Sequence, residues 1–195
     1  SGVDRVLAMD LHSAQIQGYF DIPCDHIYGS PVLIDYLETL NLSEIVVVSP
    51  DVGGVARARA FAKLMKDAPL AIIDKRRSAH NISESLTVIG EVKGKTAILI
   101  DDMIDTGGTI CSGGNLLKKE GAEKVFACAS HAVFSPPSHE RLSMKNLFEQ
   151  VIVTNSIPVS QKDYFPQLKV LSVANMLGEA IWRIHEESSV SSMFR

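Results

Sequence analysis

Cysteine, tryptophan and long apolar runs are scarce in this sequence of 195 residues. Its three cysteines, Cys24, Cys111 and Cys128, lie far apart, and none of them forms a Cys-x-x-Cys pair. An odd, scattered set of this kind argues against a zinc site or a disulfide framework, and it favours a reducing compartment. No segment approaches the ~20 apolar residues that a helix needs to cross a bilayer. The sequence therefore predicts a protein without membrane attachment.

Basic residues are also fewer than acidic ones: the sequence has 19 Lys and Arg and 23 Asp and Glu. The formal net charge of −4 excludes a broad electrostatic grip on nucleic acid, so any anion must be held by a local cluster. Hydrophobic residues make up 46% of the chain, which excludes wholesale disorder. The length is that of one domain with its own core.

Short apolar segments rich in β-branched residues alternate with stretches of helical spacing. Continuous apolar strands that alternate with helices indicate a mostly parallel sheet flanked by helices, so we predict an α/β fold. We expect helices over residues 31–40, 55–66, 109–120 and 174–187, with a helical turn at 142–145. We expect strands over residues 5–11, 45–48, 70–73, 87–92, 97–100, 125–129, 151–153 and 169–173.

The most informative segment lies after the expected strand 97–100, because open parallel sheets bind ligands beyond the carboxyl ends of their strands. Paired carboxylates, Asp101 and Asp102, are followed by Asp105 and the loop Thr106-Gly107-Gly108-Thr109 at a helix start. Glycine amides, hydroxyls and a helix N-terminus together suit a phosphate group. The paired carboxylates suit vicinal hydroxyls or a hard cation. The segment predicts a site for a phosphorylated sugar, against the alternative of a capped helix start with surface acids.

Three weaker clusters also follow expected strands. Asp51 precedes a glycine pair and suits a metal, a sugar or a helix cap. The run from Lys75 to Arg77 holds three cations that could neutralise a phosphate, or it is a solvated surface run. His12 suits a metal ligand, an acid/base group or a structural histidine.

Taken together, five stretches of the chain resemble ribose-phosphate diphosphokinases, also called phosphoribosyl pyrophosphate (PRPP) synthetases, which have a type I phosphoribosyltransferase fold. These stretches occur in the same order as in the family and span most of the chain. They are Met9–Phe20, Ser49–Arg57, Ile72–Arg77, Ile100–Thr109 and Ser189–Phe194.

The resemblance implies a protein of two tandem α/β domains, of which this chain holds the second. Residues 1–25 would close the N-terminal domain or link the two domains. Residues 26–195 would form the C-terminal, phosphoribosyltransferase-like domain that binds ribose 5-phosphate. The N-terminal half, with most of the ATP pocket, would be missing, so the chain alone would be inactive.

The resemblance also implies a reaction, in which MgATP transfers its diphosphoryl group to the anomeric hydroxyl of ribose 5-phosphate. The products would be AMP and PRPP, a precursor for nucleotide biosynthesis. Lys75 and Arg77 would be the catalytic cations, and His12 and Asp51 would bind Mg²⁺. Ribose 5-phosphate would be held by Asp101, Asp102, Asp105, Thr106, Gly107, Gly108 and Thr109, and phosphate or ADP as an effector by Ser189, Val190, Ser191 and Phe194.

Two alternatives stay open at this point. One is a phosphoribosyltransferase that consumes PRPP, and the other is a non-catalytic regulatory subunit of the synthetase family. The resemblance further implies a homo-oligomer built from dimers, with a hexamer as one form. The expected compartment is the cytoplasm or the plastid stroma.

Overall fold

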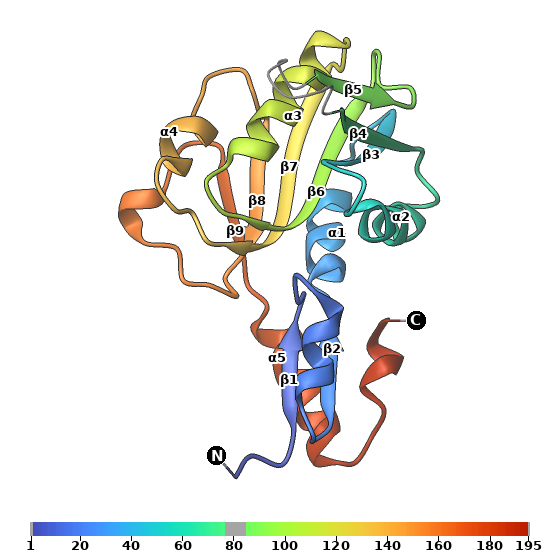
Figure 1. Ribbon diagram of the computed structural model, residues 1–195, viewed down its shortest axis with the longest axis vertical. Helices are drawn as coiled ribbons and strands as arrows, with labels where there is room; N and C mark the ends of the chain where they lie inside the picture. The colour runs from blue at the N-terminus through green and yellow to red at the C-terminus, as the bar shows by residue number, and fades with distance from the viewer. Residues whose placement is uncertain (1, 77–84, 195) are drawn as a thin grey trace.

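A seven-stranded sheet forms the centre of the computed structural model, which describes residues 2–76 and 85–194 (Figure 1). The strand order is β5-β4-β3-β6-β7-β8-β9, and every neighbouring pair is parallel except β4 with β5. The predicted α/β fold with a mostly parallel sheet is therefore confirmed. The strands are β3 (Ile45–Ser49), β4 (Leu70–Arg76), β5 (Ser85–Ile89), β6 (Thr96–Ile104), β7 (Lys124–Ala132), β8 (Gln150–Thr154) and β9 (Leu168–Leu171).

Helices cover both faces of this sheet, as the continuous apolar strands predicted. Val47 and Ile98 point to the face covered by α1 (Ser30–Thr39) and α2 (Val55–Leu64). Val46, Val48 and Leu99 point to the other face, with α3 (Gly108–Lys119) and α4 (Ser138–Leu142). All five side chains are fully buried, so β3 and β6 stabilise the centre of the domain by apolar burial on both sides.

A smaller unit extends from one end of the sheet and contains both chain termini (Figure 1). It consists of two parallel strands, β1 (Val6–Met9) and β2 (Cys24–Ile27), with the helix α5 (Ala174–His185). Short 3₁₀ helices complete the described part of the chain, at η1 (Ala14–Tyr19), η2 (Gln161–Asp163) and η3 (Val190–Phe194). The unit has a small core of its own around Ile27, Ala180 and Val190.

Three local predictions were wrong, and one strand was not predicted. The helical turn expected at 142–145 lies earlier in the chain, as α4 at Ser138–Leu142. The strand expected at 97–100 continues as β6 to Ile104, so Asp101 and Asp102 lie within the strand and not after it. The strand expected at 87–92 covers Ser85–Ile89, and Gly90 ends it with a φ of +116°. The strand β2 was not predicted at all. None of the helices in the described ranges has the length and apolar character to span a membrane.

Candidate functional site

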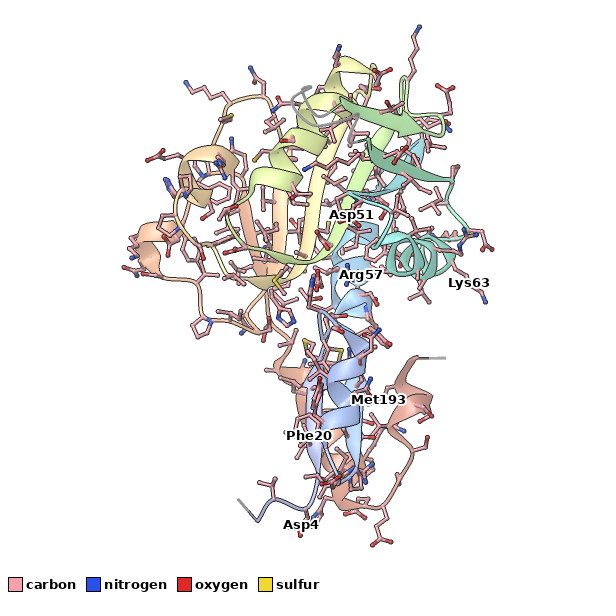
Figure 2. All side chains as sticks on the ribbon, in the orientation of Figure 1. Asp4, Phe20, Asp51, Arg57, Lys63 and Met193 are labelled. Atoms are coloured by element: carbon pink, nitrogen blue, oxygen red, sulfur yellow. The ribbon has the colours of Figure 1, made fainter. Side chains whose placement is uncertain are left out.

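Asp101 and Asp102 in β6 are the centre of the candidate site. Asp102 is 1% exposed, and Asp101 is partly buried beside it. Arg57, in the first turn of α2, places its Nη1 at 2.9 Å from Asp101 Oδ1 and at 3.4 Å from Asp102 Oδ1. One guanidinium therefore pairs with both carboxylates. Figure 2 shows Arg57, and Asp51 near it, where α2 meets the sheet.

His12 reaches the same carboxylate pair from the smaller unit. Its Nδ1 lies 2.7 Å from Asp102 Oδ2, and its side chain is 73% exposed. Two other histidines hold the segment that carries it. The backbone N–H of Leu11 donates to His26 Nε2 at 2.9 Å, and His131 Nε2 donates to the carbonyl of Met9 at 3.1 Å. Partial burial lowers the pKa of His26, which favours the neutral ring that accepts the hydrogen bond from Leu11.

The turn from β1 toward His12 is fixed by Asp10. This residue has a φ of +41°, which is uncommon for a side chain other than glycine. Its buried carboxylate accepts hydrogen bonds from the Ser130 hydroxyl and from the backbone N–H of Gly29 at 2.7 Å. Since Ser130 belongs to β7, these bonds join the smaller unit to the large sheet two residues before His12 in the chain.

The two carboxylates differ in their protonation. Burial, followed by the side-chain hydrogen bond with Asp102 and by the charge of Asp102, raises the pKa of Asp101 to about 7. Burial alone would also raise the pKa of Asp102, but its hydrogen bonds with Asp101 and His12 and the charge of Arg57 outweigh burial and lower it. Asp102 therefore carries the negative charge of the pair near neutral pH, and Asp101 exchanges its proton there.

The loop Thr106–Thr109 connects the end of β6 to the first turn of α3. Gly107 has a φ of +73° and accepts the first helical hydrogen bond, from Cys111 N at 2.9 Å. A Cβ at Gly107 would lie 3.4 Å from Leu142 Cγ, so glycine allows both the turn and the close approach of α4. The N–H groups of the first helical turn have no partner inside the helix and face the end of the loop. This geometry is that of an anion site.

Arg141 of α4 lies against this loop and was not singled out by the sequence analysis. Its Nη1 donates to the carbonyl of Thr106 at 3.0 Å. In the sequence, Arg57 was only the last residue of the stretch Ser49–Arg57 that resembles the family, and no role was predicted for it. Its place in the first turn of the helix after Asp51 was the one signal that could have placed it at this sheet edge.

Asp51 lies at the start of α2, where its Oδ1 accepts a hydrogen bond from Gly54 N at 2.8 Å. The Ser49 hydroxyl donates to the Asp51 carbonyl at 2.7 Å, which tightens the turn. One carboxylate oxygen of Asp51 therefore caps the helix. Among the described residues, no three His, Cys, Asp or Glu side chains gather as a set that could hold a metal.

The predicted catalytic cations are only partly visible. Lys75 is an exposed residue of β4, opposite Leu86 of β5. Arg77 lies outside the described residues. The structure therefore places Lys75 on the outer strand pair of the sheet, formed by β4 and β5. The predicted catalytic roles of Lys75 and Arg77 stay predictions.

The predicted effector residues lie in the tail after α5. Ser189 and Ser191 are exposed, and their hydroxyl oxygens are 2.9 Å apart. Arg183 of α5 donates to the Ser189 carbonyl at 3.3 Å, which ties the tail to the helix. Val190 is buried in the small core, and Phe194 belongs to η3, with its side chain outside the described part.

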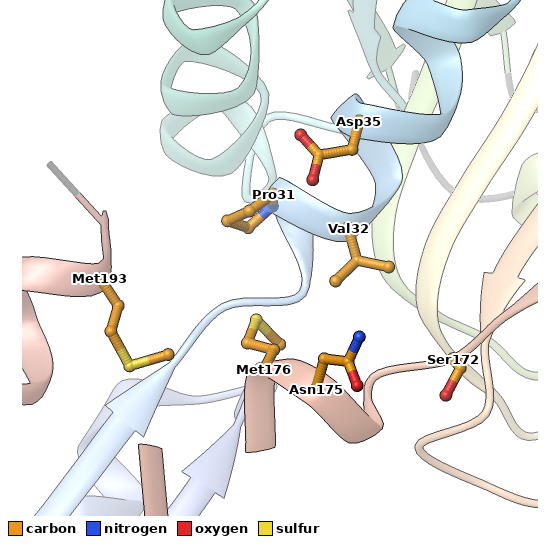
Figure 3. A pocket seen from close by; sticks show the side chains of 7 residues that line it. All are labelled: Pro31, Val32, Asp35, Ser172, Asn175, Met176 and Met193. Carbon is orange, nitrogen blue, oxygen red and sulfur yellow. The ribbon is translucent and has the colours of Figure 1, made fainter. Parts of the chain in front are cut away.

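A cavity of about 310 Å³ opens between α1, the start of α5 and η3 (Figure 3). Its only charged lining residue among those described is Asp35, an acid. None of the predicted site residues whose side chains the structure describes lines it. The cavity is lined by Pro31, Val32, Asp35, Ser172, Asn175, Met176 and Met193.

A mostly parallel sheet, a carboxylate pair on its central strand and a glycine loop at the next helix define the class of the domain. The chain belongs to the phosphoribosyl synthetase-associated domain family, whose model matches residues 71–195. The resemblance seen in the sequence is thereby confirmed.

Individual relatives point to the same family. The chain is 91% identical over 195 residues to the ribose-phosphate pyrophosphokinase of Prochlorococcus marinus subsp. pastoris, covering 100% of this chain and 59% of the relative. It is 64% identical to ribose-phosphate pyrophosphokinase 1 of spinach, covering 100% of this chain and 58% of that protein. A crystal structure of phosphoribosylpyrophosphate synthetase from Mycobacterium smegmatis matches with a TM-score of 0.87 and 44% identity, over 96% of this chain and 60% of the other. The chain thus spans about three-fifths of the length of these relatives.

Proposed function

We propose that the chain is the carboxyl-terminal part of a ribose-phosphate diphosphokinase and holds the ribose 5-phosphate of that enzyme. The observation that carries the proposal is the joint position of the Asp101–Asp102 pair and the Thr106–Thr109 loop on one strand and the helix that follows it. Asp102, charged and held by Arg57 and His12, would accept hydrogen bonds from the ribose hydroxyls. The loop amides would bind the 5-phosphate.

In this reaction the anomeric hydroxyl attacks the β-phosphorus of ATP in line, and AMP leaves. The protein has little covalent work to do, so catalysis consists of positioning and charge neutralisation. The carboxylate pair would bind the ribose hydroxyls and the loop would bind the 5-phosphate. Together these contacts would orient the anomeric hydroxyl. Lys75 and Arg77 would neutralise the diphosphoryl group during transfer.

His12 and Asp51 are the proposed Mg²⁺ residues: the Asp51 carboxylate is the oxygen donor that this ion prefers, and His12 would add a nitrogen donor. His12 Nδ1 is held by Asp102, an arrangement that orients Nε2 of a histidine toward a metal. Asp51 has one carboxylate oxygen beyond the one that caps α2. Mg²⁺ is usually bound through one or two protein groups together with substrate phosphates and water, so a larger protein cluster is not required. When bound, the ion would neutralise negative charge on the ATP phosphates.

The smaller unit suggests where the rest of the enzyme lies. A two-stranded sheet is marginal by itself and needs further strands or helices for stability. Tyr19 is 88% exposed, and Ile181 and Trp182 of α5 are also exposed. These features support a domain that residues 1–25 help to complete, formed by the N-terminal part present in the longer relatives. That part would supply most of the ATP pocket.

Regulation, assembly and compartment belong to the same proposal. Phosphate or ADP would act at the tail residues Ser189, Val190, Ser191 and Phe194, where exposed hydroxyls lie close to Arg183. The enzyme would form a homo-oligomer built from dimers. It would work in the cytoplasm or in a plastid stroma. The second compartment is included because one relative comes from a plant, spinach.

The proposal is tested by incubating the full-length protein with MgATP and ribose 5-phosphate. A synthetase forms AMP and PRPP in equal amounts, and only when ribose 5-phosphate is present. A phosphoribosyltransferase would form no AMP from MgATP and ribose 5-phosphate. With PRPP and a nucleobase as substrates, it would release pyrophosphate. A regulatory subunit would do neither alone and would alter the rate of an added catalytic partner.

A further inference from the structure

The sugar-phosphate site is rich in carboxyl groups. Asp101, Asp102 and Asp105 lie within five positions along the chain. Arg57 is already paired with two of these acids, at 2.9 and 3.4 Å. A phosphate dianion bound to the loop would therefore face acids on one side, and the loop amides alone carry only partial positive charge.

Arg141 adds a full positive charge beside the loop. Its Nη1 uses one donor on the Thr106 carbonyl, at 3.0 Å. A Cβ built at Gly108 would lie 3.3 Å from the same Nη1, so the guanidinium also borders the start of α3. Within the described ranges, no carboxylate forms an ion pair with Arg141. Four of its five N–H groups stay available for an anion.

The position of Arg141 is fixed by its neighbours. Leu142, the next residue, is fully buried and packs against Gly107. The charge of Arg141 also reaches the first turn of α3, where it acts to lower the pKa of Cys111 against the larger effect of burial, which raises that pKa to about 11. The guanidinium is thus held at the N-terminal end of α3, beside the amides that would meet a phosphate.

We infer that Arg141 is a substrate-binding residue that pairs with the 5-phosphate of the sugar substrate and so offsets the repulsion between this phosphate and the acids of the site. The inference rests on the proposed function. It adds to the phosphate site a cation that lies 35 positions after Thr106 in the chain. The alternative is a purely structural bond between α4 and the Thr106 carbonyl.

Two substitutions separate these roles. Arg141→Gln keeps an N–H donor for the Thr106 carbonyl but removes the charge, and Arg141→Lys keeps the charge but loses the planar fork. Calorimetry on the full-length protein should show ribose 5-phosphate binding about 10- to 100-fold weaker in Arg141→Gln, because a charge-assisted contact is lost. Arg141→Lys should stay within about tenfold of wild type, and ATP affinity should be unchanged in both variants.

A second measurement uses the unaltered protein, so it does not depend on how the variants fold. Phenylglyoxal labels accessible arginines, and mass spectrometry can follow the peptide that contains Arg141. Ribose 5-phosphate should protect Arg141 from labelling, and ribose should not, because ribose has no phosphate group.

The outcomes are distinct. A glutamine variant that binds ribose 5-phosphate as tightly as wild type, or that loses ATP and sugar affinity equally, overturns the role of Arg141. Equal labelling of Arg141 with and without ribose 5-phosphate overturns it as well. Wild-type protein that does not bind ribose 5-phosphate overturns the proposed function and this inference together.

Discussion

His12 and Asp102 are 90 positions apart in the chain, yet His12 Nδ1 lies 2.7 Å from Asp102 Oδ2. The contact joins the smaller unit, which carries His12, to the central strand of the large sheet. It also places the proposed metal side of the site against the proposed sugar side. A shift of one unit relative to the other would therefore disturb both parts of the site at once.

Replacing Asp101 and Asp102 by Asn together should weaken ribose 5-phosphate more than ATP in the full-length enzyme. Asparagine keeps the size of the side chain but loses charged acceptors, and each charge-assisted hydrogen bond contributes about 1.5–3 kcal/mol. We expect KM for the sugar to rise by at least tenfold, and KM for ATP to change little. A rise in KM for ATP with an unchanged sugar KM would assign these acids to the metal and ATP side.

Arg57→Met should lower the free energy of unfolding by about 1–3 kcal/mol at pH 7.5, because buried Asp102 loses a charged partner. Adding Asp102→Asn to Arg57→Met should cost less than the sum of the two single changes, since both remove the same interaction. Urea unfolding of the four proteins in this cycle measures the coupling. Arg59→Met, an exposed arginine of the same helix, is the matched control. Strictly additive losses would mean that Arg57 does not stabilise the pair.

Asp101 should make the stability of the protein fall as the pH rises toward neutrality. Its pKa is about 7 in the folded protein and 3.8 ordinarily, so the folded state holds this proton more tightly than the unfolded state does. The associated stability is fully present below pH ~4 and is lost as the pH rises through 7, with a slope of at most ~1.4 kcal/mol per unit.

Asp101→Asn should remove this contribution, so that the variant gains stability relative to wild type between pH 5 and pH 8. Urea unfolding at both pH values measures the difference, and Asp105→Asn, at an exposed acid of the following loop, serves as control. If wild type and Asp101→Asn show the same pH dependence, Asp101 does not hold its proton as described.

Lys75→Ala should lower kcat of the full-length enzyme far more than it raises either KM. A cation that acts mainly on the transition state contributes little to substrate binding, and cations of this kind contribute about 10³–10⁵ in rate to other phosphoryl transfers. We expect the lower end, because Arg77 and Mg²⁺ would share the charge. Lys75→Arg should recover part of the loss. The measurement is the single-turnover rate of AMP formation. A rate for Lys75→Ala within tenfold of wild type would show that Lys75 has no catalytic role.

The central layers of the fold could be predicted from the sequence, because strands buried on both faces leave continuous apolar runs such as 45–48 and 97–100. The strand β2, with the sequence Cys-Asp-His-Ile, gives no such signal. It is a strand because it pairs with β1, and because His26 accepts a hydrogen bond from Leu11. Those contacts are non-local and cannot be derived from a local pattern.

The site shows the same division. The acids and glycines of 101–109 are contiguous, so their chemistry was visible in the sequence. Their partners were not, since Arg57 and Arg141 come from 44 and 35 positions away. Distant partners also explain why β6 continues through the acids. Buried Asp102 is tolerated inside a strand because Arg57 and His12 offset the cost of burying its charge.

The central claim is that the loop at the start of α3 binds the phosphate of ribose 5-phosphate. Titration of the ¹⁵N-labelled chain with this ligand, followed by two-dimensional NMR, tests it most directly. We predict that ribose 5-phosphate causes the largest changes in amide chemical shift at residues 105–110. Ribose, which has no phosphate, should leave the chemical shifts of these amides unchanged. Unshifted loop amides at millimolar ribose 5-phosphate, in a folded chain, would contradict the account.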